Sequence, residues 1–345
     1  MLRIICVLFL FTHGELLSAA DSDWQPVATD LLQREKTGFG GLCGLVVDHQ
    51  TGDLFANLSD RGMFHSADQG QTWKRVSETQ PKGRTETPGC LLLDPTMKTN
   101  RMVTALVYGS PLSVSSDRAA TWKLADGKSS HIDWFAVDWT DPELRFVMAL
   151  KHEAGGLLLA SSNGGQSFSE LGKGYGTGWV FDNQTAVVAQ AKSKEQPQPN
   201  LMRTTDRGQT FQSCGEFSPV GANSAQALPK WNDGTLYWLV DGGLIATTDN
   251  GATWNKIGEI KEAQYGPIFG RNAQHLFVLT KSGPVESTNG GATWLPPLAP
   301  PKSLKGIGGL SWLDYDPQHD TLYLMKMGSD LYRLTKRPAA KTTAD

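Results

Sequence analysis

The chain has 345 residues, a formal net charge of −3 at pH 7, 39% hydrophobic residues and 19% charged residues. This composition, with 37 Gly, 18 Pro and 11 Trp, is typical of a turn-rich globular protein and excludes a wholly disordered chain. The near-neutral charge and the lack of any dense Lys/Arg block argue against nucleic acid or an anionic membrane surface as a partner.

The first 20 residues have the pattern of a signal peptide. Arg3 precedes an apolar run over residues 4–11, and Ser18, Ala19 and Ala20 are the small residues that a signal peptidase accepts. The acidic stretch that begins at Asp21 argues against the alternative, a buried N-terminal strand or helix. We expect residues 1–20 to be removed, a secreted or periplasmic protein, and no integral membrane segment after cleavage.

An eight-residue motif, Ser/Thr-x-Asp/Asn-x-Gly-x-Thr/Ser-Trp/Phe, occurs six times and organises the rest of the chain. Its copies are residues 66–73, 115–122, 161–168, 204–211, 247–254 and 287–294. They begin 40 to 49 residues apart, which is the length of a four-stranded propeller blade. Each copy therefore predicts a turn between the third and fourth strands of one blade.

The third residue of each motif predicts a structural role, because Asp and Asn side chains accept hydrogen bonds from backbone N–H groups of their own turn. These residues are Asp68, Asp117, Asn163, Asp206, Asp249 and Asn289. A calcium site or a set of catalytic acids is the alternative, but one carboxylate per turn is too few for the 6–8 oxygen ligands of Ca²⁺. In the second copy Ala119 replaces the glycine, which predicts strain or an altered turn.

Alternating apolar runs predict four strands per repeat, for example over 42–48, 53–58, 62–66 and 73–77. After the sixth motif the chain has only three further strands, over 308–315, 321–325 and 330–334. Residues 24–28 resemble the strand that follows a motif, so the N-terminus is predicted to complete the last blade. The prediction is an all-β, single seven-bladed β-propeller over 21–337 with a disordered tail over 338–345; the alternative is six blades with an appended segment.

The cysteines and glycosylation motifs leave two questions open. Cys43, Cys90 and Cys214 remain after signal removal, and buried thiols are favoured over a Cys43–Cys90 disulfide. Asn57 and Asn183 begin Asn-x-Ser/Thr motifs, which are acceptors only in a host with that machinery. No zinc-type spacing and no phosphate-binding Gly-rich loop occurs, so no metal and no cofactor is expected.

The six motifs resemble Asp-box (BNR-type) repeats, and the chain is similar to exported Asp-box propellers. That group includes sialidases, xyloglucanases, the sortilin ectodomain and photosystem II assembly-factor propellers. The resemblance covers nearly all of the mature chain and implies the propeller fold. It does not imply one activity, since the same blade serves enzymes, receptors and assembly factors.

Binding residues of a propeller are expected on the face opposite the motif turns. Its loops, between second and third strands and between blades, carry charged and aromatic residues that could contact a ligand. The binding candidates are Arg61, Arg84, His131, Lys151, His152, Tyr175, Trp179, Tyr265 and Lys281. The carboxylates available for glycoside hydrolysis are Asp60, Glu153 and Asp241.

The enzymatic resemblances are incomplete. The Arg-Ile-Pro strand of sialidases is absent. Residues 54–64 are similar to the xyloglucanase segment that holds a catalytic Asp, which would be Asp60, but the partner acid in that family comes from a second propeller. The leading hypothesis is therefore a non-catalytic module that binds a protein or a glycan; the alternative is a glycoside hydrolase or lyase that uses the loop carboxylates.

Overall fold

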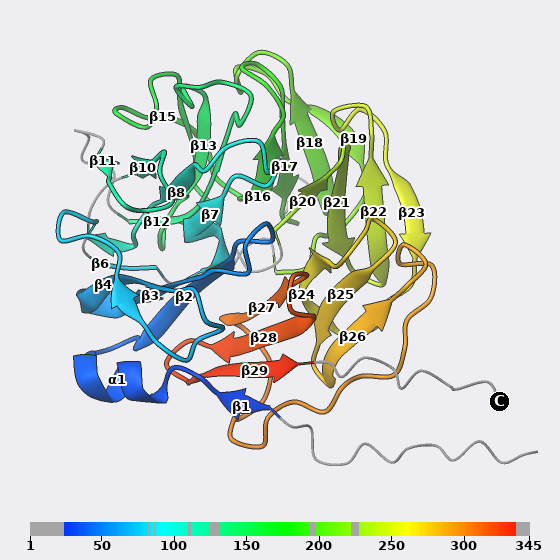
Figure 1. The fold of residues 1–345 in the computed structure, drawn as a ribbon. Coiled ribbons are helices and arrows are strands. Elements are labelled where there is room, and N and C mark those ends of the chain that lie inside the picture. The colour runs from blue at the N-terminus through cyan, green and yellow to red at the C-terminus, as the bar shows by residue number, and fades with distance from the viewer. Residues whose placement is uncertain are drawn as a thin grey trace, which may run out of the picture.

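The computed structural model describes residues 24–335, apart from 82, 86, 110–111, 125–130, 193–197 and 222–227. The predicted signal peptide (1–20) and C-terminal tail (338–345) lie outside the described residues. Seven antiparallel sheets are arranged in a ring, so the chain is a seven-bladed β-propeller and the six-bladed alternative is wrong (Figure 1).

The blades follow the chain in order, and the first strand of each lines the central channel. Blade 1 contains β2 (Leu42–Val47), β3 (Leu54–Leu58), β4 (Gly62–Ser66) and β5 (Lys74–Arg75). Blade 2 contains β7 (Leu91–Leu93), β8 (Met102–Thr104), β10 (Ser113–Ser115) and β11 (Lys123–Leu124). Blade 3 contains β12 (Ile132–Val137), β13 (Val147–Lys151), β14 (Leu158–Ser161) and β15 (Ser169–Gly172). Blade 4 contains β16 (Tyr175–Val180), β17 (Ala186–Gln190), β18 (Asn200–Thr204) and β19 (Gln212–Gly215).

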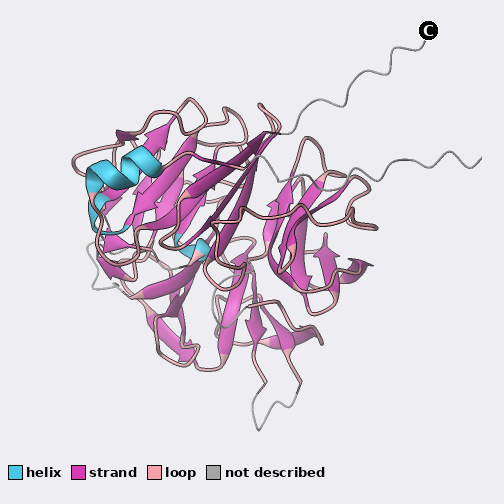
Figure 2. Cartoon of the chain, turned by 90° about the horizontal axis from the view of Figure 1, so that it is seen from below, coloured by secondary structure: helices cyan, strands magenta, loops and turns pink. Residues whose placement is uncertain are grey.

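The remaining elements complete the ring. Blade 5 contains β20 (Lys230–Asn232), β21 (Thr235–Val240), β22 (Gly243–Thr247) and β23 (Asn255–Gly258). Blade 6 contains β24 (Ala263–Phe269), β25 (Leu276–Thr280) and β26 (Gly283–Ser287), and blade 7 contains β27 (Ser311–Asp316), β28 (Thr321–Lys326), β29 (Leu331–Thr335) and β1 (Gln25–Pro26). Outside the blades lie α1 (Thr29–Glu35), the short helices η1 (Ser59–Arg61) and η2 (Pro88–Cys90), and a ribbon of β6 (Gly83–Arg84) and β9 (Tyr108–Gly109) (Figure 2).

The N-terminal strand closes the ring as predicted. β1 pairs antiparallel with β29, with Gln25 opposite Arg333 and Pro26 opposite Tyr332. Proline is accommodated there because β1 is the outermost strand and needs no further N–H donor. Trp24 and Leu31 then pack in one core cluster with residues of blades 1, 6 and 7, which joins the two ends of the chain.

The sixth blade has a modified outer edge. Its regular sheet has three strands, and residues 295–298 occupy the fourth position. The Leu295 and Leu298 N–H groups donate to β26, each at 2.8 Å, but Pro296 and Pro297 between them have no N–H to continue a ladder. Helix α1 was also not predicted, because its seven residues follow directly on the short edge strand.

The six motif turns have a shared hydrogen-bond pattern, which supports their structural role. In the first, the Ser66 hydroxyl donates to Asp68 Oδ1 (2.8 Å) and accepts from the Gly70 N–H (2.8 Å). Asp68 Oδ1 also accepts from the Thr72 N–H (2.8 Å), and Oδ2 accepts from the Thr72 hydroxyl (2.6 Å). These bonds lower the pKa of Asp68, although partial burial opposes the shift.

Asparagine and alanine fit the same turn. Asn163 keeps the pattern by donating from its amide nitrogen to Ser167 Oγ (2.9 Å) while its oxygen accepts as an aspartate would. Ala119 has φ +68° and its N–H still donates to Ser115 Oγ at 2.8 Å. The altered geometry considered for this turn is therefore absent, and the strain is confined to a left-handed backbone at a buried alanine.

A second repeat, which the sequence analysis missed, caps the turns between first and second strands. An Asp at the end of the innermost strand accepts from the N–H two residues later at 2.8–2.9 Å. The residues are Asp48, Asp94, Asp138, Asp182 and Asp316. Their role is that of Asx turns, which stabilise the strand reversal.

Candidate functional site

The molecule has two faces because neighbouring strands run antiparallel. The turn face carries the six motif turns and the connections between first and second strands, and the loop face carries the second-to-third connections and the links between blades. In the described part of the chain, no helix is long and apolar enough to cross a membrane. Nor do three or more His, Cys, Asp or Glu side chains gather as a metal site among those residues.

On the loop face, Arg84 lies between two exposed aromatic rings. Its guanidinium carbon is 4.5 Å from the ring centroid of Phe39 and 4.5 Å from that of Tyr108. Phe39 is 76% exposed and Tyr108 is 43% exposed, so both rings are open to solvent. Arg84 and Tyr108 are held opposite each other because β6 pairs with β9.

Two histidines complete this loop-face cluster, which we define as Phe39, Arg84, Tyr108, His131, Asp133 and His152. His152 Nδ1 lies 2.7 Å from Asp133 Oδ1, and its Nε2 lies 3.2 Å from the Tyr108 hydroxyl. The His131 ring meets Tyr108 edge-on, with centroids 5.3 Å apart. Asp133 thus fixes the His152 ring, which in turn holds Tyr108.

The structure brings together three of the predicted binding residues, Arg84, His131 and His152, although they come from three separate loop-face connections of the chain. Phe39, Tyr108 and Asp133 lie in the loops that the sequence predicts for this face, but they were not among the selected binding candidates. Phe39 and Tyr108 had a usable signal, since each is an aromatic residue in a polar, glycine-containing loop.

The three candidate carboxylates lie in separate surroundings. Asp60 is 2.8 Å from Arg61 Nη1, and Glu153 is 3.7 Å from His152 Nε2. Their side chains are 55% and 80% exposed, which is not the desolvated setting of a glycosidase proton donor. Asp241 lies in the β21–β22 turn of blade 5, and no contact among the described residues joins it to either.

The other predicted residues have separate surroundings. Arg61 uses its guanidinium to hold the end of α1, donating to the carbonyls of Glu35 (2.8 Å) and Lys36 (3.1 Å). Tyr175 is partly buried against Phe211, with centroids 5.4 Å apart. Lys151 is exposed at the end of β13, and Lys281 lies 3.9 Å from Glu262.

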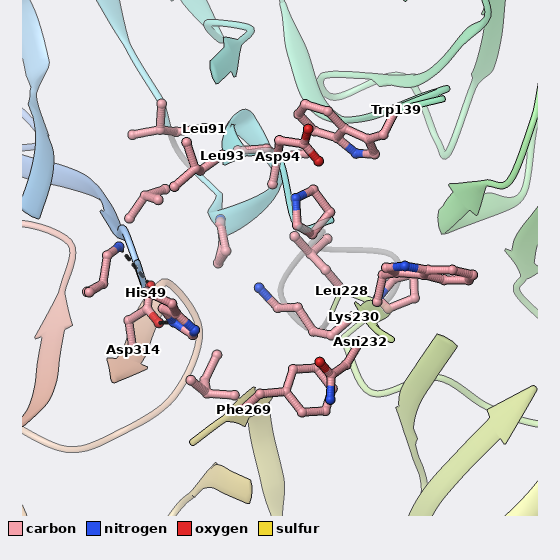
Figure 3. Close-up of a pocket in the computed structure, with 18 of the residues that line it drawn as sticks. His49, Leu91, Leu93, Asp94, Trp139, Leu228, Lys230, Asn232, Phe269 and Asp314 are labelled. Atoms are coloured by element: carbon pink, nitrogen blue, oxygen red, sulfur yellow. Dashed lines mark hydrogen bonds and ion pairs between the residues drawn. The ribbon is translucent and has the colours of Figure 1, made fainter. Parts of the chain in front are cut away.

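Trp179 and Tyr265 lie in the innermost strands β16 and β24, not in the loops where the sequence analysis placed them. Both line a cavity of about 170 Å³ in the central channel. Apolar side chains form most of its wall, and Lys230 extends its amino group into it (Figure 3). His49, Pro95 and Trp139 follow the innermost strands β2, β7 and β12, so the cavity reaches the turn face.

Polar contacts hold parts of the cavity wall in place. Asp314 accepts from the Val47 N–H (3.0 Å) and lies 3.1 Å from His49 Nε2, which ties blade 7 to blade 1. Lys230 Nζ lies 3.5 Å from the Tyr265 hydroxyl and 5.3 Å from its ring centroid. Burial raises the pKa of Tyr265, and the charge of Lys230 opposes that shift.

Among the described residues, Cys43, Cys90 and Cys214 are not joined by disulfides, so the Cys43–Cys90 disulfide is absent. Cys43 Sγ faces Asn57 Oδ1 at 2.9 Å, whereas Cys90 Sγ faces the Ile132 and Asp133 carbonyls at 3.1 Å. Asn57 is 1% exposed within β3, so the folded protein does not present it to a glycosyltransferase. Asn183 is exposed in the β16–β17 turn.

No protein-family profile matches the chain, and no curated protein sequence matches it. Two solved structures illustrate its similarity to known folds. One is titled "YCF48 bound to D1 peptide" (TM-score 0.52, 13% identity, 87% of this chain and 95% of that one). The other is the extracellular domain of the putative hybrid two-component system BT4673 from B. thetaiotaomicron (TM-score 0.55, 10% identity, 92% of this chain and 40% of that one).

These comparisons establish the propeller fold alone. The chain spans less than half of the BT4673 structure that it matches.

Proposed function

We propose that this protein is an exported Asp-box propeller that acts as a non-catalytic binding module and takes a segment of another protein on its loop face. The observation that carries the proposal is the loop-face cluster. Arg, Tyr and other aromatic side chains dominate the energetics of protein interfaces, and here Arg84 is stacked between Phe39 and Tyr108 on an exposed surface.

The cluster fits a protein ligand better than a sugar. One face of each ring is covered by Arg84, and the two histidines occupy the edge of Tyr108, so no wide flat platform is left for a pyranose ring. The cluster is also preorganised, because the β6–β9 ribbon and the Asp133–His152 contact fix it before any ligand arrives.

Three further observations support the assignment. The hydrogen-bond pattern of the motif turns agrees with the Asp-box resemblance, and residues 1–20 have the features of a signal peptide. The neighbour titled YCF48 is bound to a peptide, and the BT4673 neighbour is an extracellular domain. The solvent exposure of the Asp60 and Glu153 carboxylates argues against the hydrolase alternative.

The proposal is tested by selecting ligands for the mature protein from a random peptide library and, in parallel, from a glycan array. Affinities are then compared for Phe39→Ala and Arg84→Ala, which we expect to weaken peptide binding at least about 10-fold each. Leu295→Ala and Lys256→Ala are matched controls, since both side chains are exposed and lie outside the cluster.

Peptides that bind all four variants equally would contradict the proposal, as would a protein that selects no peptide. If the protein retains a glycan and the cluster variants do not, the ligand of the loop face is a sugar and not a protein. Release of reducing ends that is lost in Asp60→Asn or Glu153→Gln would establish the hydrolase instead.

A further inference from the structure

Lys230 brings an ammonium group to the cavity in the central channel, and no ion pair joins it to a carboxylate among the residues that the structure describes. Lys230 is partly buried, and its amino group points into the cavity (Figure 3). Within the ranges that the structure describes, its polar contact is the Tyr265 hydroxyl, at 3.5 Å, which is the outer limit of a hydrogen bond. An ammonium group in such a setting is stabilised by a counter-ion.

The carboxylates around the cavity already have polar partners. Asp48 pairs with Arg118 (3.1 Å), and Asp94 pairs with Arg101 (3.7 Å) and accepts from the Thr96 and Thr99 hydroxyls. Asp314 accepts from the Val47 N–H (3.0 Å) and contacts His49 Nε2 (3.1 Å). Among the described lining residues, Lys230 is therefore the Lys or Arg side chain that has no ion pair and can offer its charge to a ligand.

The aromatic side chains in the rest of the wall favour a ligand that is flat and apolar apart from its charged group. Trp139 and Phe269 lie on different sides of the cavity, with Lys230 between them (Figure 3). The Trp179 ring is fixed by stacking on Trp231, with centroids 6.1 Å apart and planes 5° from parallel. At about 170 Å³ the cavity is smaller than the roughly 300–1,000 Å³ of pockets for drug-sized ligands, so its ligand is small.

We propose that this cavity binds a small aromatic carboxylate, whose carboxylate accepts from Lys230 Nζ and whose ring lies among Trp139, Trp179 and Phe269. The ligand enters from the turn face, where the connections after β2, β7 and β12 form the rim. The site is thus on the opposite side of the ring from the loop-face cluster, and the proposal does not depend on the proposed function.

The test titrates the mature protein with benzoate, phenylacetate and indole-3-acetate and follows binding by calorimetry and by quenching of tryptophan fluorescence. The neutral amides of the same acids are the matched ligands. We expect at least one acid to bind in the micromolar to low-millimolar range and its amide to bind at least about 10-fold more weakly, since hydrogen bonds to a charged group are the stronger ones.

Lys230→Met keeps most of the length of the side chain and removes its charge, and it should abolish the preference for acid over amide. Lys230→Arg should retain part of that preference, and Lys256→Met, on the exposed edge strand β23, should leave it unchanged. Equal binding of acids and amides to the unaltered protein would overturn the proposal, as would no binding by any acid. The comparison of acids with amides uses the unaltered protein, so it tests the proposal even if Lys230→Met does not fold.

Discussion

Asp330 ties the two ends of the propeller together, and removing its carboxylate should measure what ring closure contributes. Its Oδ1 accepts from the Ala28 N–H at 2.9 Å and its Oδ2 accepts from the Thr29 hydroxyl, so a residue of blade 7 caps the start of α1. Asp330→Ala removes both contacts, whereas Asp330→Asn keeps an acceptor for the N–H and a donor for the hydroxyl oxygen.

The expected loss follows from burial. Ala28 is 1% exposed, so its N–H would lose its partner without easy access to water. Hydrogen bonds to charged groups contribute about 1.5–3 kcal/mol, and a buried unsatisfied donor costs about 1–3 kcal/mol. Asp330→Ala should therefore lower the free energy of unfolding by about 2 kcal/mol, and Asp330→Asn by less than about 1 kcal/mol.

The assay is urea unfolding followed by tryptophan fluorescence, with far-UV circular dichroism as a second probe. We expect a single transition whose midpoint falls in Asp330→Ala with an unchanged slope, and a drop in Tm of about 4 °C. An Asp330→Ala protein as stable as the original would refute the closure argument. So would equal losses in both variants, since charge and not hydrogen bonding would then be responsible.

Three further predictions concern the turns and the thiols. Ala119→Gly should change stability by less than about 1 kcal/mol, because relief of the left-handed backbone (about 1–2 kcal/mol) is offset by lost methyl burial and by added freedom of the unfolded chain. Gly70→Ala, whose new methyl would lie 2.8 Å from Val27 Cβ, should cost more than about 2 kcal/mol, and equal urea midpoints for the two would contradict the turn geometry. Hydrogen bonds from Thr253 lower the pKa of Asp249 to about 2, so the unfolded state takes up the proton first as pH falls and stability is lost between about pH 4 and pH 2. Asp249→Asn, which can adopt the Asn163 pattern, should show a smaller fall in urea midpoint from pH 5 to pH 3, and an identical fall would count against this account. Burial raises the pKa of Cys43 and of Cys214 to about 11, so labelling of native protein with a thiol reagent at pH 8 should be slow until it unfolds; rapid labelling of either would contradict the placement.

The fold was predictable because its signals are local and repeated. The side-chain hydrogen bonds of each motif turn join residues four or fewer apart, so Ser66, Asp68 and Thr72 predict the turn without knowledge of the rest of the chain. Ring closure was predictable from the resemblance between residues 24–28 and the strand after each motif. The irregular outer edge of blade 6 could have been predicted, since Pro296 and Pro297 lie where a regular strand would need N–H donors.

The candidate sites were less predictable because they depend on contacts between blades. Arg84 and Tyr108 meet only because β6 pairs with β9, and His152 reaches Tyr108 from the next blade. The position of Lys230 in the cavity could not be predicted, since a single lysine beside a tryptophan in a short strand has no periodic pattern. Trp179 and Tyr265 were assigned to loops because an innermost strand with glycine or proline beside them resembles a loop in sequence.

The central claim is that a protein ligand occupies the loop face. Hydrogen–deuterium exchange of the mature protein, with and without a peptide selected as described above, tests it most directly. The account predicts slower exchange over residues 37–41, 106–109 and 150–153, with the motif turns unchanged. Protection confined to the motif turns, or to the far side of the ring, would contradict it.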